Sequence, residues 1–121
     1  MNDKNTNEKT GLALYITLTN DNFQEEVIES PLPVMVVFIA GWYGSYHIVA
    51  NILAELASEF RVKIKFCELD AIAFNNITEE YKISELPTFL FFNGGTLVDK
   101  AVGMVRRKDL VEKLNSLLCA A

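Results

Sequence analysis

The chain has 121 residues, of which 50% are hydrophobic, and its 16 acidic and 11 basic side chains give a formal net charge of −5. This length and apolar content suffice for one domain with a single core that needs neither disulfides nor a metal. Because no run of Lys and Arg interrupts the acidic balance, we expect no nucleic-acid partner.

The two ends and the cysteines indicate a simple organisation. Residues 1–10 (MNDKNTNEKT) are polar, so we expect a flexible tail there and a folded domain over residues 11–121. The longest apolar stretch, residues 32–40, is too short to span a bilayer, so neither export nor membrane insertion is expected. Cys67 and Cys119 match neither a disulfide framework nor a zinc pattern, which favours a reducing cytoplasm without metal or cofactor.

The first part of the domain predicts a short strand and then a helix. Residues 12–18 (LALYITL) form the strand candidate. Thr19 or Asn20 can cap the helix, whose apolar positions fall at helical spacing, at Phe23, Val27 and Ile28. The two prolines of residues 30–33 (SPLP) end this helix.

A continuous apolar run over residues 34–39 (VMVVFI) predicts a strand buried on both faces, in the middle of a helix-covered sheet. Residues 45–60 carry apolar side chains at steps of three and four, which predicts a long amphipathic helix. Residues 42–46 (WYGSY) therefore form a loop at the C-terminal end of a strand and the N-terminus of a helix.

The second half continues the alternation and then changes it. Residues 62–69 predict a strand that ends in Asp70, and residues 77–81 belong to a short helix.

Two further strand candidates, residues 88–92 and 96–102, flank Asn93-Gly94-Gly95. The Asn-Gly pair tolerates the positive φ of tight hairpin turns, so an antiparallel hairpin is predicted. Residues 109–118 form a final amphipathic helix. This order predicts an α/β single domain with a mixed sheet covered on both faces.

Four motifs together resemble the thioredoxin family over about residues 12–118. They are FxAxWxGxx with Phe38, Ala40, Trp42 and Gly44; Glu68-Leu69-Asp70 at the end of a strand; residues 83–89 (ISELPTF); and residues 92–95 (FNGG) followed by Val102-Gly103. The resemblance implies a thioredoxin fold, with a mixed sheet of about five strands flanked by about four helices. It also implies that Pro87 follows a cis peptide bond and faces the redox loop.

The redox loop departs from the family at its reactive positions. Family members read Trp-Cys-Gly-Pro-Cys, whereas this chain reads Trp42-Tyr43-Gly44-Ser45-Tyr46. Thioredoxin chemistry needs a thiolate to attack a disulfide and a second thiol to resolve the mixed disulfide. A phenol, with a pKa near 10, supplies neither step. No catalytic residue is therefore assigned.

Further departures agree with this one. The resemblance places a buried Asp at the position of Val37 and often a Lys at that of Phe66, and both are apolar here. A buried carboxylate with no sulphur to serve would only incur a desolvation penalty. Ser45 replaces the loop proline, where its hydroxyl could cap the helix, and Asn51 replaces the proline that usually kinks the helix.

Two interpretations of the aromatic loop stay open. The tyrosines could be aromatic side chains that fill space at the rim of the core. They could instead form a recognition surface, because aromatic side chains supply large contact areas at low entropy cost. The resemblance implies a groove that holds an extended peptide beside the proline. We assign that groove to Trp42, Tyr43, Gly44, Ser45, Tyr46, Leu86, Pro87, Gly103 and Met104.

Other reactive residues have simpler interpretations. Cys67 lies mid-strand among apolar residues and is expected to be buried and inert, whereas Cys119 near the C-terminus is expected to be more accessible. His47 has no partner that would make it a base or a ligand. The basic cluster Arg106-Arg107-Lys108 is expected to be solvated.

The sequence leaves several functions open. The leading hypothesis is a redox-inactive thioredoxin-like domain that binds a peptide or protein of unknown identity, as a scaffold, chaperone-like accessory module or regulatory subunit. The alternative is an atypical thiol-disulfide oxidoreductase, monothiol through Cys119 or working with a partner's cysteines. Self-association in a homodimer could also occupy the aromatic groove. Tyrosines introduced into a redox-active parent are a third explanation, although serine or alanine would remove a thiol with less disturbance.

Overall fold

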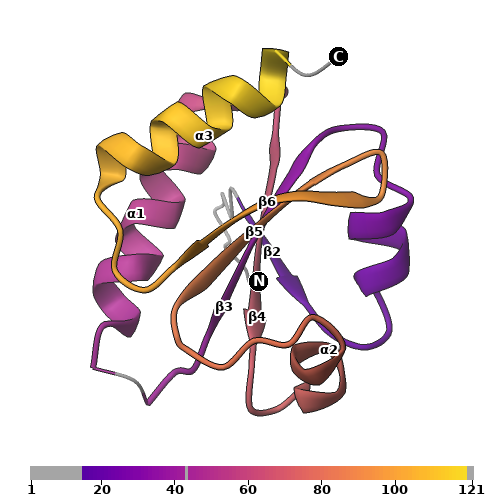
Figure 1. Cartoon of the computed structure of the whole chain (residues 1–121), viewed down its shortest axis with the longest axis vertical. Helices are drawn as coiled ribbons and strands as arrows, with labels where there is room; N and C mark the ends of the chain where they lie inside the picture. The colour runs from indigo at the N-terminus through magenta and orange to yellow at the C-terminus, as the bar shows by residue number, and fades with distance from the viewer. Residues whose placement is uncertain (1–14, 43, 120–121) are drawn as a thin grey trace, which may run out of the picture.

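The computed structural model describes residues 15–42 and 44–119, and within them nine elements alternate along the chain (Figure 1). They are β2 (Ile16–Leu18), η2 (Gln24–Ile28), β3 (Val34–Ile39), α1 (Tyr46–Glu59), β4 (Lys65–Asp70), α2 (Asn75–Glu80), β5 (Thr88–Asn93), β6 (Thr96–Val102) and α3 (Arg107–Cys119). The predicted tail over residues 1–10, the start of the first predicted strand and Tyr43 lie outside the described residues.

One mixed sheet organises the fold, in the strand order β2-β4-β3-β5-β6. β2 and β3 both pair with β4 in parallel, whereas β5 is antiparallel to both β3 and β6. All six residues of β3 are buried, because helices cover both faces of the sheet at its centre. The predicted position of this strand, in the middle of the sheet, is confirmed.

Two apolar clusters pack against the two faces. One cluster joins the α1 and α3 helices to alternate residues of the strands, including Met35, Val37 and Ile39 of β3. The other joins η2 and α2 to the opposite set, including Val36 and Phe38. Figure 1 shows α1 and α3 on one side of the strands and η2 and α2 on the other. The expected α/β architecture is therefore confirmed.

The predicted cap of the first helix lies at Thr19, the first of its two candidates. The Thr19 hydroxyl accepts a hydrogen bond from the Asp21 amide (3.1 Å), and the Asn22 carboxamide oxygen accepts one from the Thr19 amide (2.7 Å). The Thr19 backbone oxygen accepts from the Phe23 amide (3.2 Å), as in the first turn of a helix. These are the reciprocal bonds of a capping box. The π-helical part, η2, then begins at Gln24.

The predicted strand over residues 62–69 starts too early. Val62 has a φ of +61°, which a β-strand cannot contain, and β4 begins at Lys65. Residues 61–63 thus belong to the turn that ends α1 rather than to the sheet.

The hairpin is confirmed, although its turn residues shift by one. Asn93 is the last residue of β5 and pairs with Thr96. The two central residues are Gly94 (φ +61°) and Gly95 (φ +81°), as turns with two positive φ angles require. A Cβ on Gly95 would lie 2.5 Å from the backbone oxygen of Ile28, so the hairpin packs closely against η2.

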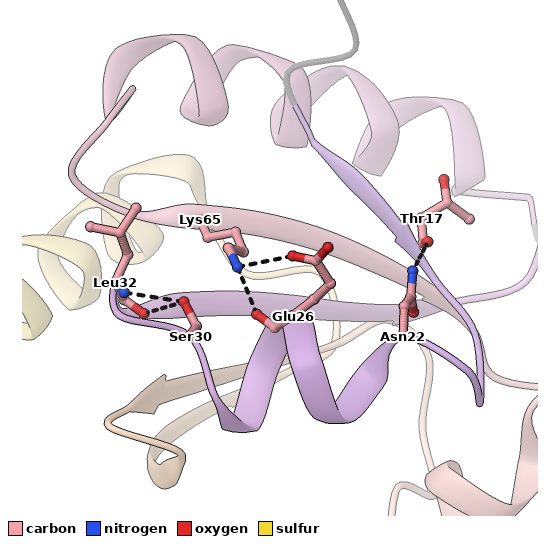
Figure 2. Close-up of polar contacts among 6 residues, drawn as sticks. All are labelled: Thr17, Asn22, Glu26, Ser30, Leu32 and Lys65. Atoms are coloured by element: carbon pink, nitrogen blue, oxygen red, sulfur yellow. Dashed lines mark hydrogen bonds and ion pairs between the residues drawn. The ribbon is translucent and has the colours of Figure 1, made fainter.

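Polar contacts fix η2 against the strands on its other sides (Figure 2). The Asn22 carboxamide donates to the Thr17 backbone oxygen of β2 (3.1 Å). The Lys65 ammonium donates both to the backbone oxygen of Glu26 (3.0 Å) and to its carboxylate (2.9 Å). After the helix, the Ser30 hydroxyl closes a turn with the backbone of Leu32, which ends the helix where predicted.

Candidate functional site

Three chain segments meet at the end of the sheet where α1 begins (Figure 1). In the register, Phe38 of β3 pairs with Thr88 of β5, and Thr88 pairs with Val102 of β6. The loop after β3, the segment before β5 and the loop after β6 therefore lie beside one another. These are the three segments that supply the predicted groove.

The floor of this region is made by backbone. The Leu86–Pro87 peptide bond is cis, as the resemblance implied. The Gly103 amide donates to the Pro87 backbone oxygen (2.8 Å), which joins the last two segments. Gly103 has a φ of +84°, and a Cβ there would lie 3.0 Å from the Glu85 carboxylate, so a side chain would be strained and crowded.

The outer side of the region presents apolar side chains. Trp42 is 73% exposed and Met104 is 50% exposed. Gly44 is also exposed, whereas Leu86 is half-buried against the core cluster below it and Pro87 is buried. Nothing is assigned to Tyr43, which is outside the described residues. Large exposed apolar side chains that gather in one place are typical of interaction surfaces.

Tyr46 takes a different position from Trp42. It is half-buried and packs against the apolar cluster beneath α1. It also lines a pocket of about 180 Å³ together with Thr17, Glu68 and Asp70. Tyr46, at the second redox position, is therefore partly buried under the loop, whereas the side chain of Trp42 is mostly exposed to solvent.

Glu68 also lines this pocket, although no pattern in the sequence assigned it to the site. Glu68 pairs with Thr17 on one side and with Val37 on the other, so the three side chains lie in one row on the face of the sheet that α1 covers. Burial raises the pKa of the Glu68 carboxyl, which accepts a long hydrogen bond from the Thr17 hydroxyl (3.4 Å). The strand alternation of Phe66 and Glu68 was the available signal, because both positions face the same side.

The charge of Glu68 acts on two tyrosines. It is the largest cause that raises the pKa of the Tyr46 hydroxyl, followed by burial. Burial is the largest cause that raises the pKa of the Tyr15 hydroxyl, followed by the charge of Glu68. Both phenols are therefore held protonated more firmly than a free tyrosine, as hydrogen-bond donors rather than nucleophiles.

Ser45 occupies the N-cap position of α1 but does not cap it through its side chain. Its hydroxyl oxygen is buried and has no hydrogen-bond partner among the described residues. The predicted hydroxyl cap is therefore wrong. Ser45 has a ψ of 7°, whereas a capping residue usually adopts an extended conformation.

The two positions predicted to have lost their polar groups are core residues. Val37 and Phe66 are fully or almost fully buried in the α1-facing cluster. The Phe66 ring packs on Phe60 with centroids 6.3 Å apart. Neither side chain carries a polar atom, and in the register a carboxylate at position 37 would lie beside Glu68.

The remaining cysteines are not at the loop. Cys67 is buried in β4, and burial raises the pKa of its thiol to about 12, which leaves essentially no thiolate at neutral pH. Cys119 is exposed at the C-terminal end of α3. Figure 1 shows that end of α3 at the opposite end of the molecule from the start of α1.

The other candidate residues carry no site. His47 is exposed and contacts the Tyr46 ring, with centroids 5.4 Å apart. Arg106 pairs with Asp109 (3.2 Å), and Arg107 pairs with the acidic residues Glu55 and Glu59 of α1. The predicted basic cluster is thus partly paired within the chain rather than wholly solvated.

The described residues contain neither a metal-binding cluster nor a membrane-spanning helix. Within residues 15–42 and 44–119, no group of three or more His, Cys, Asp and Glu side chains could hold a metal ion. In that same part of the chain, no helix has both the length and the apolar character needed to cross a membrane.

The fold and the segments that meet at the end of the sheet define the class of protein: a single α/β domain of the thioredoxin fold. The sequence model of the family described as Thioredoxin matches residues 14–116. The chain therefore belongs to the thioredoxin family.

Several thioredoxins are similar to this chain along most of their length. It is 34% identical over 101 residues to the thioredoxin of Synechocystis sp., covering 84% of this chain and 94% of that protein. It is 33% identical over 101 residues to the chloroplastic M-type thioredoxin of Chlamydomonas reinhardtii, covering 84% of this chain and 72% of that protein. It is 30% identical to thioredoxin 1 of Synechococcus elongatus, covering 88% and 100%.

Proposed function

We propose that this chain is a redox-inactive, cytoplasmic member of the thioredoxin family that binds a peptide or protein partner through the groove beside Pro87. One observation carries the proposal: tyrosines occupy both positions at which the family's redox loop carries cysteine, Tyr43 and Tyr46. Without a thiolate there is no attack on a disulfide sulphur and no mixed disulfide to resolve.

The surroundings of the loop support the loss of the chemistry. Val37 and Phe66 are packed as hydrocarbon, so neither position offers a charged group that could assist a loop thiol. The two cysteines do not replace the missing pair, because Cys67 is buried and Cys119 is at the far end of α3.

The same region keeps features that suit peptide binding. Trp42, in the loop after β3, and Met104, in the loop after β6, supply exposed apolar area in segments beside the backbone joined by the Gly103–Pro87 hydrogen bond. An extended peptide can add backbone hydrogen bonds beside such a segment while its side chains contact the aromatic surface. A binding role needs this geometry and no sulphur.

A second function has one observation in its favour. The relatives named above are called thioredoxins, and the names favour an atypical thiol-disulfide oxidoreductase that uses Cys119 or a partner's cysteines. Cys119 is exposed, so it can meet another protein's disulfide. This function requires a reactive thiol, and that requirement separates it from the binding role.

The binding role is tested with a reduced and alkylated, permanently unfolded polypeptide as the probe. Amide NMR spectra of the protein, recorded as the probe is added, should shift signals of Gly44, Gly103 and Met104. Replacing Trp42 and Tyr43 with alanine should weaken binding by about tenfold or more, as loss of an aromatic hot spot does. Alanine at Met104 should weaken it less.

Leu97→Ala is the matched control. Leu97 is an exposed apolar residue of β6, but it pairs with Phe92 near the hairpin turn, away from Gly103. Its replacement should leave the affinity unchanged. An affinity that survives the Trp42/Tyr43 replacement, or that Leu97→Ala reduces equally, would reject the groove. Signals that shift with protein concentration alone would indicate that a second copy of the chain occupies it.

A further inference from the structure

A second hollow of the molecule lies between η2 and α2, outside the groove beside Pro87. It has a volume of about 430 Å³ and takes its lining from both helices and from the turn before η2. This volume falls within the range of about 300–1,000 Å³ that is usual for small-ligand sites. None of its lining residues belongs to the four motifs that relate the chain to thioredoxins.

The η2 wall of this pocket is held in place. The contacts of Asn22 and Lys65 tie it to the strands (Figure 2), and the hairpin residue Gly95 packs against Ile28 at its end. The π-helical geometry of η2 is itself rare, and such turns occur frequently at functional sites. The η2 side of the pocket is therefore positioned by contacts within the chain.

Aromatic rings form part of the lining. Phe23 and Tyr81 line the pocket with ring centroids 5.8 Å apart. Tyr81 is also fixed from behind by Phe92, with centroids 5.6 Å apart in an edge-to-face arrangement. Ring faces of this kind attract planar or cationic groups.

The polar lining is rich in acceptors. The side chains of Asn20, Gln24 and Asn76 contribute carboxamides, and Glu80 contributes a carboxylate. Gln24 donates its amide to Glu29 (3.1 Å), so its carboxamide oxygen remains as an acceptor. Among the described residues that line the pocket, none is a lysine, an arginine or a histidine.

Glu80 and Tyr81 both line this pocket. Burial raises the pKa of the Tyr81 hydroxyl, and the charge of Glu80 raises it further. An anion such as phosphate or a carboxylate would thus meet negative charge and no cation. A cation, in contrast, would meet both the carboxylate and the ring.

We propose that the pocket between η2 and α2 binds a guanidinium group, carried either by a free arginine-like small molecule or by an arginine side chain of a peptide. A guanidinium ion is planar and only donates hydrogen bonds, so it matches carboxamide oxygens and a carboxylate. It also stacks on aromatic rings, which a compact ammonium does less well. The net charge of −5 favours the approach of such a cation.

The test follows amide and side-chain carboxamide NMR signals while free arginine, N-acetyl-arginine amide or the corresponding lysine compounds are added. Signals of Asn20, Gln24 and Asn76 should shift with both arginine compounds and less with lysine. If N-acetyl-arginine amide binds more tightly than free arginine, the guanidinium group that the pocket binds belongs to a peptide. If free arginine binds more tightly, it belongs to a small molecule.

Two neighbouring carboxylates give a matched pair of variants. Glu80 lines the pocket, whereas Glu79 precedes it in α2 and does not. Glu80→Gln should weaken arginine binding by about fivefold, the scale of an exposed ion pair, and Glu79→Gln should leave it unchanged. Tyr81→Phe keeps the ring and should retain most of the affinity.

Three results would overturn the proposal. They are the absence of carboxamide shifts with either arginine compound, an equal loss of affinity in the Glu79 and Glu80 variants, and equal or tighter binding of the lysine compounds. Both glutamates are exposed, so the variants are expected to fold, and an unchanged melting temperature checks this.

Discussion

Single side chains explain why this chain keeps a redox fold without the redox site. Thioredoxin chemistry requires polar groups that are costly to bury, and positions 37 and 66 hold Val and Phe instead. Val37 pairs with Glu68 of the neighbouring strand in the sheet register. Among the described residues of that row, Glu68 carries the only carboxylate, and it is half-buried. Val37 and Phe66 therefore stabilise the core rather than assist a thiol.

Val37→Asp tests this explanation by restoring the family's buried acid. The carboxylate would lie fully buried without the basic partner that Phe66 replaces, and we expect a loss of at least about 3 kcal/mol at neutral pH. Burial raises the pKa of such an acid, so the loss shrinks as pH falls below that raised value and is complete above it.

Val37→Asn is the control for Val37→Asp, since it has the same shape without the charge. Its stability, measured by chemical denaturation, should show no extra dependence on pH. Equal stability of the Asp and Asn variants at all pH values would contradict the explanation.

Glu68→Gln should change the dependence of stability on pH. The folded-state pKa of Glu68 is raised above its ordinary value of 4.5, so the folded state binds this proton more tightly than the unfolded state. Glu68 therefore lowers stability as pH rises from about 4.5 through the folded pKa. Glutamine has no such charge, so the variant's stability should not decline over this pH range. Above the range, denaturation midpoints should be higher for the variant than for the wild type.

The same substitution should lower the pKa of Tyr46, because the Glu68 charge is the largest cause of its elevation. Ultraviolet titration of tyrosinate in the wild type, Glu68→Gln and Tyr46→Phe assigns the signal. The titration that is lost in Tyr46→Phe belongs to Tyr46. If its pKa is the same in the wild type and in Glu68→Gln, the proposed proximity of Tyr46 and Glu68 is wrong.

At the scale of elements, the sequence predicted those whose pattern is long or specific. The buried run of β3, the helical spacing of α1 and the glycine turn between β5 and β6 all appear in the structure. The start of β4 was not predictable, because it depends on the positive φ of Val62 in the turn after α1. The pocket under the loop also escaped prediction, because it depends on the register of Thr17, Val37 and Glu68 across three strands.

The hairpin glycines give a matched test of packing against η2. Both have a positive φ, but a Cβ on Gly94 would meet nothing within 4 Å, whereas one on Gly95 would meet Ile28. Gly94→Ala should cost about 1 kcal/mol for the left-handed backbone alone. Gly95→Ala should cost more than about 2 kcal/mol by denaturation, because the clash with backbone adds to that strain. An equal loss of stability in the two variants would show that η2 does not pack closely against the hairpin.

At the scale of the whole molecule, fold and chemistry separate. The chain keeps the mixed sheet and the meeting of three segments at its end, which position a partner in the proposed function. Family membership follows from the motifs that build this framework, whereas activity depends on a few reactive atoms, and function cannot be inferred from the fold alone.

The most direct measurement is reduction of insulin disulfides with dithiothreitol as the electron donor, on the wild type and on a Cys67→Ala/Cys119→Ala variant. Because neither loop position carries sulphur, we predict that both proteins leave the rate at the dithiothreitol background. A wild-type rate above background that disappears in the variant would contradict the account and assign thiol chemistry to one of these cysteines.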